Sequence, residues 1–161
     1  MSRPAFSIAA PSLVAAILFL ALPSAARAAD LEGTASVVSA NVIAVGDTRL
    51  RLAGIEAPRP DQVCLRDDSE WECGRSAVAY LAEVIASRPV RCTVVAETPG
   101  QTPAARCLAG PDDLALKMVL AGFAFAYRRE GEDYSELEGV AQRLRRGLWT
   151  SDFLLSGDLP R

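Results

Sequence analysis

Histidine is absent from this chain of 161 residues, and its four cysteines include no C-x-x-C pair. Zinc sites in small proteins rely on histidine and on closely spaced cysteines, so both absences argue against a zinc centre. Lysine is nearly absent as well, with Lys117 as the only example. No cysteine lies near residue 29, where an acyl chain would have to be attached after signal cleavage. The cysteines therefore need another explanation than metal binding or lipidation.

An apolar N-terminal segment predicts export. Arg3 precedes an uninterrupted apolar run over residues 13–22, and Ala26 and Ala28 fit the small-x-small pattern of a cleavage site. A membrane span needs roughly 20 apolar residues, so the run is too short for the alternative, an uncleaved anchor. We expect a periplasmic or secreted protein. Its predicted parts are a signal peptide (residues 1–28), a mature domain (29–149) and a C-terminal tail (150–161).

The expected mature chain is acidic. Without Arg3 and Arg27, 15 of the 17 basic residues remain against 20 acidic residues, a formal net charge of −5. Proteins that bind a phosphate backbone usually carry a basic patch, so this balance disfavours nucleic acid as a partner. Arg143, Arg145 and Arg146 are interpreted first as the solvated end of a helix and second as such a patch. The partner stays open.

The cysteines indicate two disulfides. Cys64, Cys73, Cys92 and Cys107 all follow the predicted signal, and an even number in an exported chain favours disulfides over free thiols. Cys92 and Cys107 flank a predicted hairpin turn on adjacent antiparallel strands, within bridging distance. Cys64 and Cys73 bracket one acidic loop. The predicted pairs are therefore Cys64–Cys73 and Cys92–Cys107.

Hydrophobic patterning predicts both strands and helices. Residues 48–55 alternate like a half-buried strand, with Leu50 and Leu52 on one face and Arg49 and Arg51 on the other. Other strands are expected in segments rich in β-branched or small residues, bounded by Gly and Pro turns. The expected strands cover residues 31–38, 41–45, 48–55, 90–97, 104–109 and 123–127.

Three helices are predicted between and after these strands. Apolar positions recur at helical spacing over residues 75–87. Asp112 is expected to cap a second helix over residues 113–121. Ser135 and Glu138 form the pattern of a capping box, which would open the third helix. Residues 56–73 contain two prolines and a run of acids and are expected to be an irregular loop.

This order of elements predicts an α+β fold, a five-stranded β-barrel of the OB type with three helices closing one side. A flat α+β sandwich would produce the same order and is the alternative. Leu148 and Trp149, which follow the last helix, are expected to pack back onto the core.

Several segments together resemble the thermonuclease, or staphylococcal-nuclease-like, family. The resemblance extends over residues 31–149 and rests on the order and spacing of its pieces. These are GTASVV (33–38), RLAGIEAP (51–58), WECGRSA (71–77), VRC (90–92), ARC (105–107), AGFAFAY (121–127) and RGLW (146–149). The resemblance implies an OB-fold nuclease that uses Ca²⁺ to cut phosphodiesters in DNA and RNA.

The resemblance also implies where the catalytic machinery would lie. The two calcium-binding carboxylates fall on Asn41 and Glu56, and the two phosphate-binding arginines on Arg51 and Thr102. The general base falls on Arg59. Arg59 stays protonated and has no acceptor atom, so it cannot take a proton from water. Asn41 keeps an oxygen but lacks the negative charge that calcium prefers.

These substitutions predict an exported domain that has lost nuclease chemistry and serves as a binding or structural module without a cofactor. The alternative is an active Ca²⁺-dependent endonuclease with a rearranged site, in which Asp61 or Glu56 acts as the base. A third possibility is an OB-fold binder of peptide or glycan, because fold does not fix function. Arg51 has two interpretations. It is either a retained phosphate contact or the ion-pair partner of Glu56 or Asp47.

Overall fold

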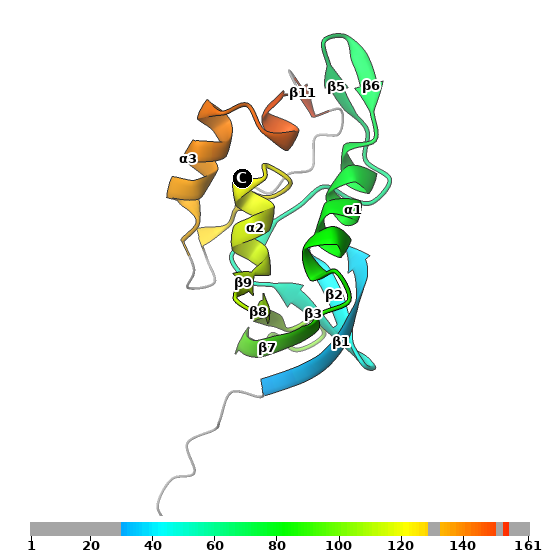
Figure 1. Ribbon diagram of the computed structural model, residues 1–161, viewed down its shortest axis with the longest axis vertical. Helices are drawn as coiled ribbons and strands as arrows, with labels where there is room; N and C mark the ends of the chain where they lie inside the picture. Colours follow the sequence, from blue (N-terminus) through cyan, green and yellow to red (C-terminus); the bar gives the residue numbers. More distant parts are fainter. Residues whose placement is uncertain (1–29, 129–132, 151–152, 155–161) are drawn as a thin grey trace, which may run out of the picture.

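The computed structural model describes residues 30–128, 133–150 and 153–154, so the predicted signal peptide lies outside the described residues (Figure 1). The helices are α1 (Cys73–Ile85), α2 (Leu114–Leu120), α3 (Ser135–Arg143) and the short 3₁₀ helix η2 (Gly147–Thr150). The longer strands are β1 (Asp30–Ser39), β2 (Val42–Val45), β3 (Thr48–Leu52), β7 (Pro89–Ala96) and β8 (Ala104–Ala109). The shorter strands are β4 (Ile55–Glu56), β5 (Cys64–Arg66), β6 (Ser69–Trp71), β9 (Asp112–Asp113), β10 (Phe125–Ala126) and β11 (Phe153–Leu154).

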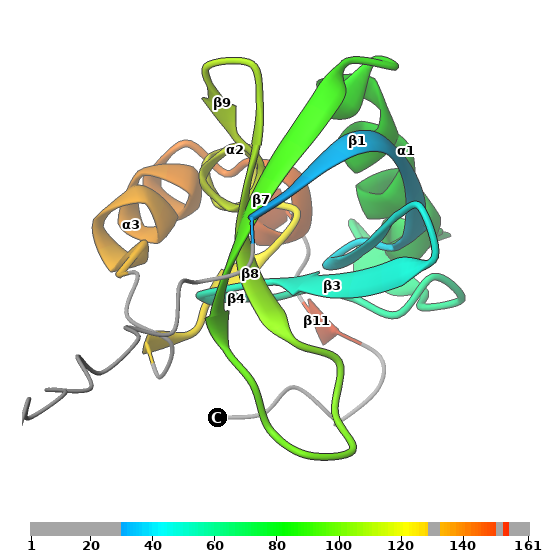
Figure 2. The ribbon, with the colours of Figure 1, turned by 90° about the horizontal axis from the view of Figure 1, so that it is seen from below.

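Five strands close into a barrel (Figures 1 and 2). β2 and β7 flank β1, β3 pairs with β2, and β8 pairs with β7, all antiparallel. The barrel closes where β3 pairs in parallel with β8, with Arg51 opposite Ala104. Backbone bonds from Arg51 N to Pro103 O and from Ala53 N to Ala105 O, both 2.9 Å long, complete this seam. The predicted five-stranded OB-type barrel is confirmed.

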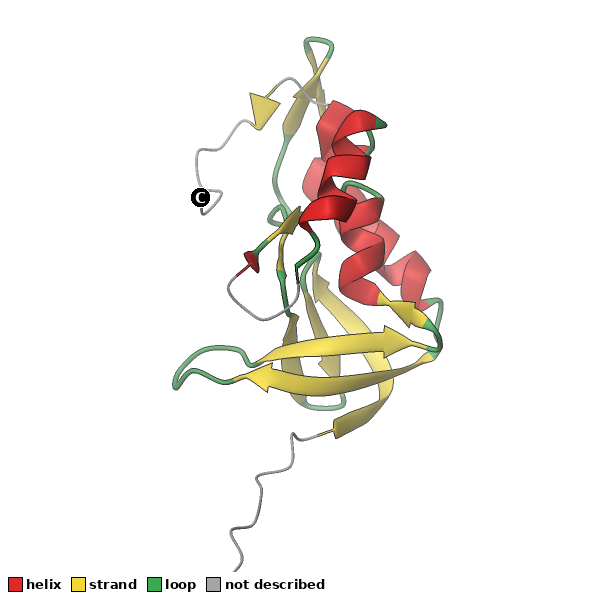
Figure 3. Cartoon of the chain, turned by 90° about the vertical axis from the view of Figure 1, so that its left-hand side faces the viewer, coloured by secondary structure: helices red, strands yellow, loops and turns green. Residues whose placement is uncertain are grey.

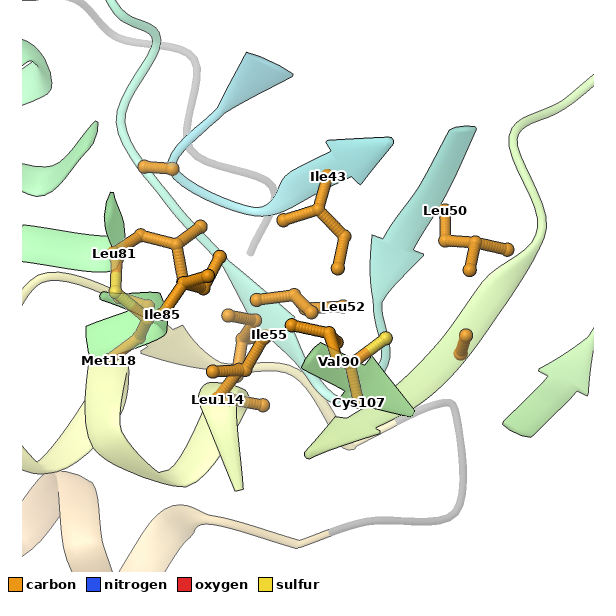
Figure 4. Packing of buried hydrophobic residues seen from close by; sticks show 14 of the residues in the cluster. Ile43, Leu50, Leu52, Ile55, Leu81, Ile85, Val90, Cys107, Leu114 and Met118 are labelled. Carbon is orange, nitrogen blue, oxygen red and sulfur yellow. The ribbon is translucent and has the colours of Figure 1, made fainter. Parts of the chain in front are cut away.

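Alternating strand residues fill the barrel interior, as the pattern predicted. Leu50 and Leu52 are fully buried, whereas Arg49 is exposed. Ile43 of β2 and Val90 of β7 are also fully buried and lie in the same cluster (Figure 4). Each aliphatic side chain of this size contributes roughly 1.5–3 kcal/mol when it leaves water, so these residues provide much of the driving force for folding.

The helices pack above one end of the barrel. α1 contacts α2, and α2 contacts α3 (Figures 1 and 3). Ala77, Leu81 and Ile85 recur every four residues along α1, so all three lie on one face and are buried. Met118 of α2 belongs to the same core (Figure 4). The predicted first helix is present, although it begins at Cys73 and ends at Ile85.

The start of α2 corrects one prediction. Asp113 and not Asp112 is the cap, because its Oδ1 accepts a hydrogen bond of 3.1 Å from Leu116 N. Asp112 belongs to β9, and its two carboxylate oxygens lie 3.0 Å from Arg88 Nη1 and 2.9 Å from Lys117 Nζ. The carboxylate of Asp112 is thus engaged by two cations, and the following aspartate caps the helix.

The capping box predicted for α3 is wrong. The side chain and backbone N–H of Ser135 both donate to Asp133 Oδ1. Glu138 Oε1 accepts a hydrogen bond of 3.0 Å from Ala126 N, so this carboxylate holds β10 against α3. The N-cap residue is Tyr134, which makes no side-chain cap bond. The competing partners of Ser135 and Glu138 explain why the sequence pattern failed.

Residues 56–73 are more ordered than the predicted irregular loop. β5 and β6 form a hairpin that projects from the body of the molecule (Figure 1). Its turn places Asp67 and Asp68 at φ angles of 49° and 60°, a region that aspartate enters more readily than most residues. β11 pairs with the other edge of β5, which the predicted tail did not indicate. Strands of two or three residues are too short to show a period in sequence.

A second, small core lies beside this hairpin. Cys64, Cys73 and Leu148 are buried there, and Phe125 packs against them. Trp149 meets Phe125 edge to face, with 5.3 Å between ring centroids. Leu148 and Trp149 therefore pack back as predicted, but onto this second core and not into the barrel.

Both predicted disulfides are present, Cys64–Cys73 and Cys92–Cys107. Cys92 lies directly opposite Cys107 in the β7–β8 ladder, and the other bridge ties β5 to the start of α1. Disulfides persist in oxidising compartments, which indicates a non-cytoplasmic environment. In the part of the chain that the structure describes, none of the helices combines the length and the apolar character needed to span a bilayer.

Removing the disulfide within the barrel should destabilise the protein. Replacing Cys92 and Cys107 by alanine should lower the free energy of unfolding by about 3 kcal/mol, because the bridge closes a loop with a sequence separation of 15. The Cys64–Cys73 bridge, with a separation of 9, should contribute slightly less. Urea unfolding of each double variant measures both values. Peptide mapping that joined Cys64 to Cys92 or Cys107 would contradict the pairing.

Asp112 should make stability depend on pH in the acid range. Hydrogen bonds from Lys117 and then Arg88 hold the pKa of Asp112 below its ordinary value of 3.8. A carboxyl whose pKa is lower in the folded state stabilises the fold above the unfolded-state pKa and loses this effect as the pH falls through the folded-state pKa. Asp112→Asn should therefore lower the urea midpoint at neutral pH, and the difference from the wild type should shrink below pH 3.8. Asp47→Asn, in an exposed turn, is the control and should leave the midpoint unchanged.

Candidate functional site

Three of the four positions that the resemblance assigns to calcium and phosphate binding lie close together. Asn41 lies in the turn between β1 and β2, and its carbonyl accepts a hydrogen bond of 2.8 Å from Leu52 N. Arg51, on β3, is paired with Val42, the residue after Asn41. Glu56 follows on β4, just beyond the end of β3. The fold therefore brings together three residues that are separated in sequence by up to 15 positions.

Asn41 and Glu56 contact each other directly. Asn41 Nδ2 donates to Glu56 Oε2 at 3.4 Å, and Ser39 Oγ donates to Asn41 Oδ1 at 3.1 Å. The hydroxyl thus engages the amide oxygen, and the amide N–H group faces the carboxylate. Calcium needs several oxygen ligands, preferably anionic, so this donor set fits it poorly. Among the residues that the structure describes, no cluster of three or more His, Cys, Asp or Glu side chains is arranged to hold a metal ion.

The hairpin between β7 and β8 carries the position of the second arginine. Its tip extends away from the barrel (Figure 2), and Thr102 lies exposed near the start of β8. Pro103, the next residue, accepts the backbone hydrogen bond from Arg51. The seam of the barrel therefore sets Arg51 beside the hairpin, where the structure places a small hydroxyl in place of a second guanidinium.

Arg59, at the position of the general base, lies on the loop that leaves β4. Its side chain is 56% exposed, and its Nε lies 3.7 Å from Asp61 Oδ1. Asp61 was the alternative base, and its side chain is 84% exposed. The carboxylate of Asp61 thus lies in open solvent and is paired with the guanidinium of Arg59.

The backbone at Arg59 is held by a buried glutamine that the sequence reasoning did not identify as functional. Gln62 is 6% exposed, and its Oε1 accepts a hydrogen bond of 3.3 Å from Arg59 N. Gln62 N donates to Arg59 O at 2.9 Å, and Gly74 N donates to Gln62 O at 3.1 Å. A Cβ on Gly74 would lie 1.8 Å from Arg59 O, so only glycine fits at this position of α1. Gly74 lies in one of the segments that carry the resemblance (71–77), but the sequence alone did not indicate this role.

Comparison with known proteins assigns the family. A model described as "Staphylococcal nuclease homologue" matches residues 49–151, which is more than half of the chain. The chain therefore belongs to the staphylococcal nuclease family, as the resemblance indicated. The match covers Arg51, Glu56, Arg59 and Thr102 but begins after Asn41. The assignment of Asn41 to a calcium-ligand position therefore stays a prediction from the resemblance.

A curated relative of this chain is named for a biosynthetic role and not as a nuclease. The chain is 39% identical over 70 residues to the succinoglycan biosynthesis protein ExoI of Rhizobium meliloti (strain 1021). The similarity covers 42% of this chain and 37% of the relative. The chain thus spans little more than a third of the length of this relative.

Gly74 should be intolerant of any side chain. Gly74→Ala should lower the free energy of unfolding by about 1–3 kcal/mol, because the methyl group has to displace the backbone carbonyl of Arg59. Gly139→Ala is the matched control, since Gly139 also lies in a helix and its Cβ would meet only the tip of Arg143. This control should be neutral or stabilising by up to about 1 kcal/mol. Equal urea midpoints for the two variants would contradict the close approach at Gly74.

Proposed function

We propose that this protein is an exported staphylococcal-nuclease-like domain that does not cleave nucleic acid and serves as a binding or structural module in the periplasm or outside the cell. The contact between Asn41 and Glu56 is the observation that carries this proposal. It places an N–H donor against the carboxylate where a calcium-binding nuclease needs a second oxygen ligand. Export is supported by the apolar N-terminal segment and by the two disulfides.

The remaining positions support the same conclusion. A lost general base typically costs a factor of about 10²–10⁴ in rate, and a lost charge-stabilising donor about 10²–10³. Arg59 replaces the base and Thr102 replaces one arginine. Rate losses from residues that act together do not simply multiply, but either loss alone lowers the rate by about 10²-fold or more. Arg51 is the one phosphate-binding position that keeps its guanidinium.

The alternative, an active Ca²⁺-dependent endonuclease, would need a different base. Asp61 faces Arg59, and Glu56 accepts a hydrogen bond from Asn41, so both candidates are already engaged. The name of the relative, a succinoglycan biosynthesis protein, refers to a polysaccharide and not to nucleic-acid cleavage. This supports a role for the domain outside nuclease chemistry, with a glycan or a peptide as the class of ligand.

A cleavage assay tests the proposal. The oxidised mature protein is incubated with single-stranded DNA and with RNA, in Ca²⁺ or in EDTA, and product is quantified over time. We expect no metal-dependent cleavage. The triple variant Asn41→Asp, Arg59→Glu, Thr102→Arg restores the three altered positions and should gain Ca²⁺-dependent cleavage of at least about 10²-fold over the wild type.

Arg51→Ala is the control for contaminating nuclease. Cleavage by the wild type that needs Ca²⁺ and disappears in Arg51→Ala would overturn the proposal, because the activity would then belong to this site. Cleavage that persists in Arg51→Ala comes from a contaminant and leaves the wild type inactive, as proposed.

A further inference from the structure

We infer that Asn41 and Glu56 form a direct clasp that holds the β1–β2 turn against β4 without a metal ion. In a calcium-binding site a cation would join these two positions, whereas here the side chains join each other. The inference deepens the proposed function and rests on it in one respect, since both place Asn41 and Glu56 at calcium-ligand positions. It makes a separate claim about what stabilises the fold.

The clasp connects two sheets. β1 and β2, on either side of Asn41, belong to the barrel, whereas β4 pairs with β10 in a separate two-stranded sheet. Asn41 and Glu56 are 15 residues apart, so their contact closes the chain between the first turn of the barrel and the strand that leaves it. A tie at this point restrains the path from β3 to the loop that carries Arg59.

The polarity of the clasp disfavours a cation between the two side chains. Ser39 Oγ donates to Asn41 Oδ1, which turns Nδ2 of the amide toward Glu56. A cation bound by both residues would need the amide oxygen on the side of the carboxylate. The amide would have to turn over, and the hydrogen bond from Asn41 Nδ2 to Glu56 Oε2 would be lost. The site therefore favours the metal-free pair.

Exchange of the two side-chain types tests the clasp. Asn41→Asp places two carboxylates against each other and should lower the thermal unfolding midpoint in EDTA by several degrees, on the order of 3–6 °C. Adding Glu56→Gln to this variant restores one donor and one acceptor with their roles reversed. The double variant should recover at least half of the lost midpoint. If the loss of midpoint in the double variant equals the sum of the losses in the two single variants, the clasp is overturned.

A charge-matched control separates the clasp from a general effect of added negative charge. Gln101→Glu makes the same amide-to-acid change at the exposed tip of the β7–β8 hairpin and should leave the midpoint unchanged. An equal loss in Gln101→Glu would count against the clasp. Should Asn41→Asp fail to fold in EDTA, the double variant still decides, because its folding shows the coupling and its failure contradicts it.

Calcium alone provides the second measurement. At about 1 mM Ca²⁺, the range in which extracellular calcium modules bind, a cation site would raise the unfolding midpoint. We expect the wild-type midpoint to be the same in Ca²⁺ and in EDTA. A rise in Ca²⁺ that is lost in Glu56→Gln would show a cation at this site and overturn the inference. Coupling between the two residues together with cleavage by the wild type would refute the proposed function but leave the clasp intact.

Discussion

The parallel seam between β3 and β8 is the constraint on which the rest of the structure depends. It joins strands that are about 50 residues apart, a closure that removes the exposed edges of the barrel sheet. Arg51 and Ala53 donate backbone hydrogen bonds across the seam, so the direction in which the chain leaves β3 is set there. β4 and the loop with Arg59 follow from that direction. The candidate site is therefore a consequence of barrel closure.

α2 and the start of α3 are attached to the barrel through a polar group that is independent of the candidate site. Asp113 is 8% exposed, and its carboxylate accepts hydrogen bonds from Leu116 N, Arg106 Nε and the hydroxyl of Tyr134. These donors come from α2, from β8 and from the residue before α3. A buried carboxylate is tolerable because each of these contacts compensates for lost hydration. The scaffold can thus stay intact while the charges of the site change.

The sequence predicted the elements that have a periodic hydrophobic pattern and missed the features that depend on tertiary contacts. The alternation of Leu50 and Leu52 with arginine and the apolar face of α1 are local patterns, and the structure confirms both. The caps predicted for α2 and α3 were wrong because the expected capping residues have other partners. Asp112 pairs with two cations, and Glu138 accepts a hydrogen bond from Ala126 N. The β5–β6 hairpin escaped notice because its strands are only three residues long.

The residues at the candidate site were predicted from a resemblance, but only the structure shows which of them contact one another. Nothing in the sequence shows that Ser39 orients the amide of Asn41, or that Gln62 and Gly74 hold the backbone of Arg59. These contacts join residues whose types are unremarkable in a turn or a loop. They explain how altered residues are held at the positions that the family resemblance assigns to catalysis.

The substitutions at the site are consistent with one another in electrostatic terms. Two carboxylates at positions 41 and 56 would repel each other unless a cation lay between them, so an amide at Asn41 removes both the repulsion and the need for the cation. Under the proposed function, a guanidinium at Arg59 faces no metal charge at this site. Glu56 remains as the carboxylate that the amide can bind. In the proposed metal-free site, the N–H donor of Asn41 is therefore the feature that distinguishes this pair of residues from two calcium-binding carboxylates.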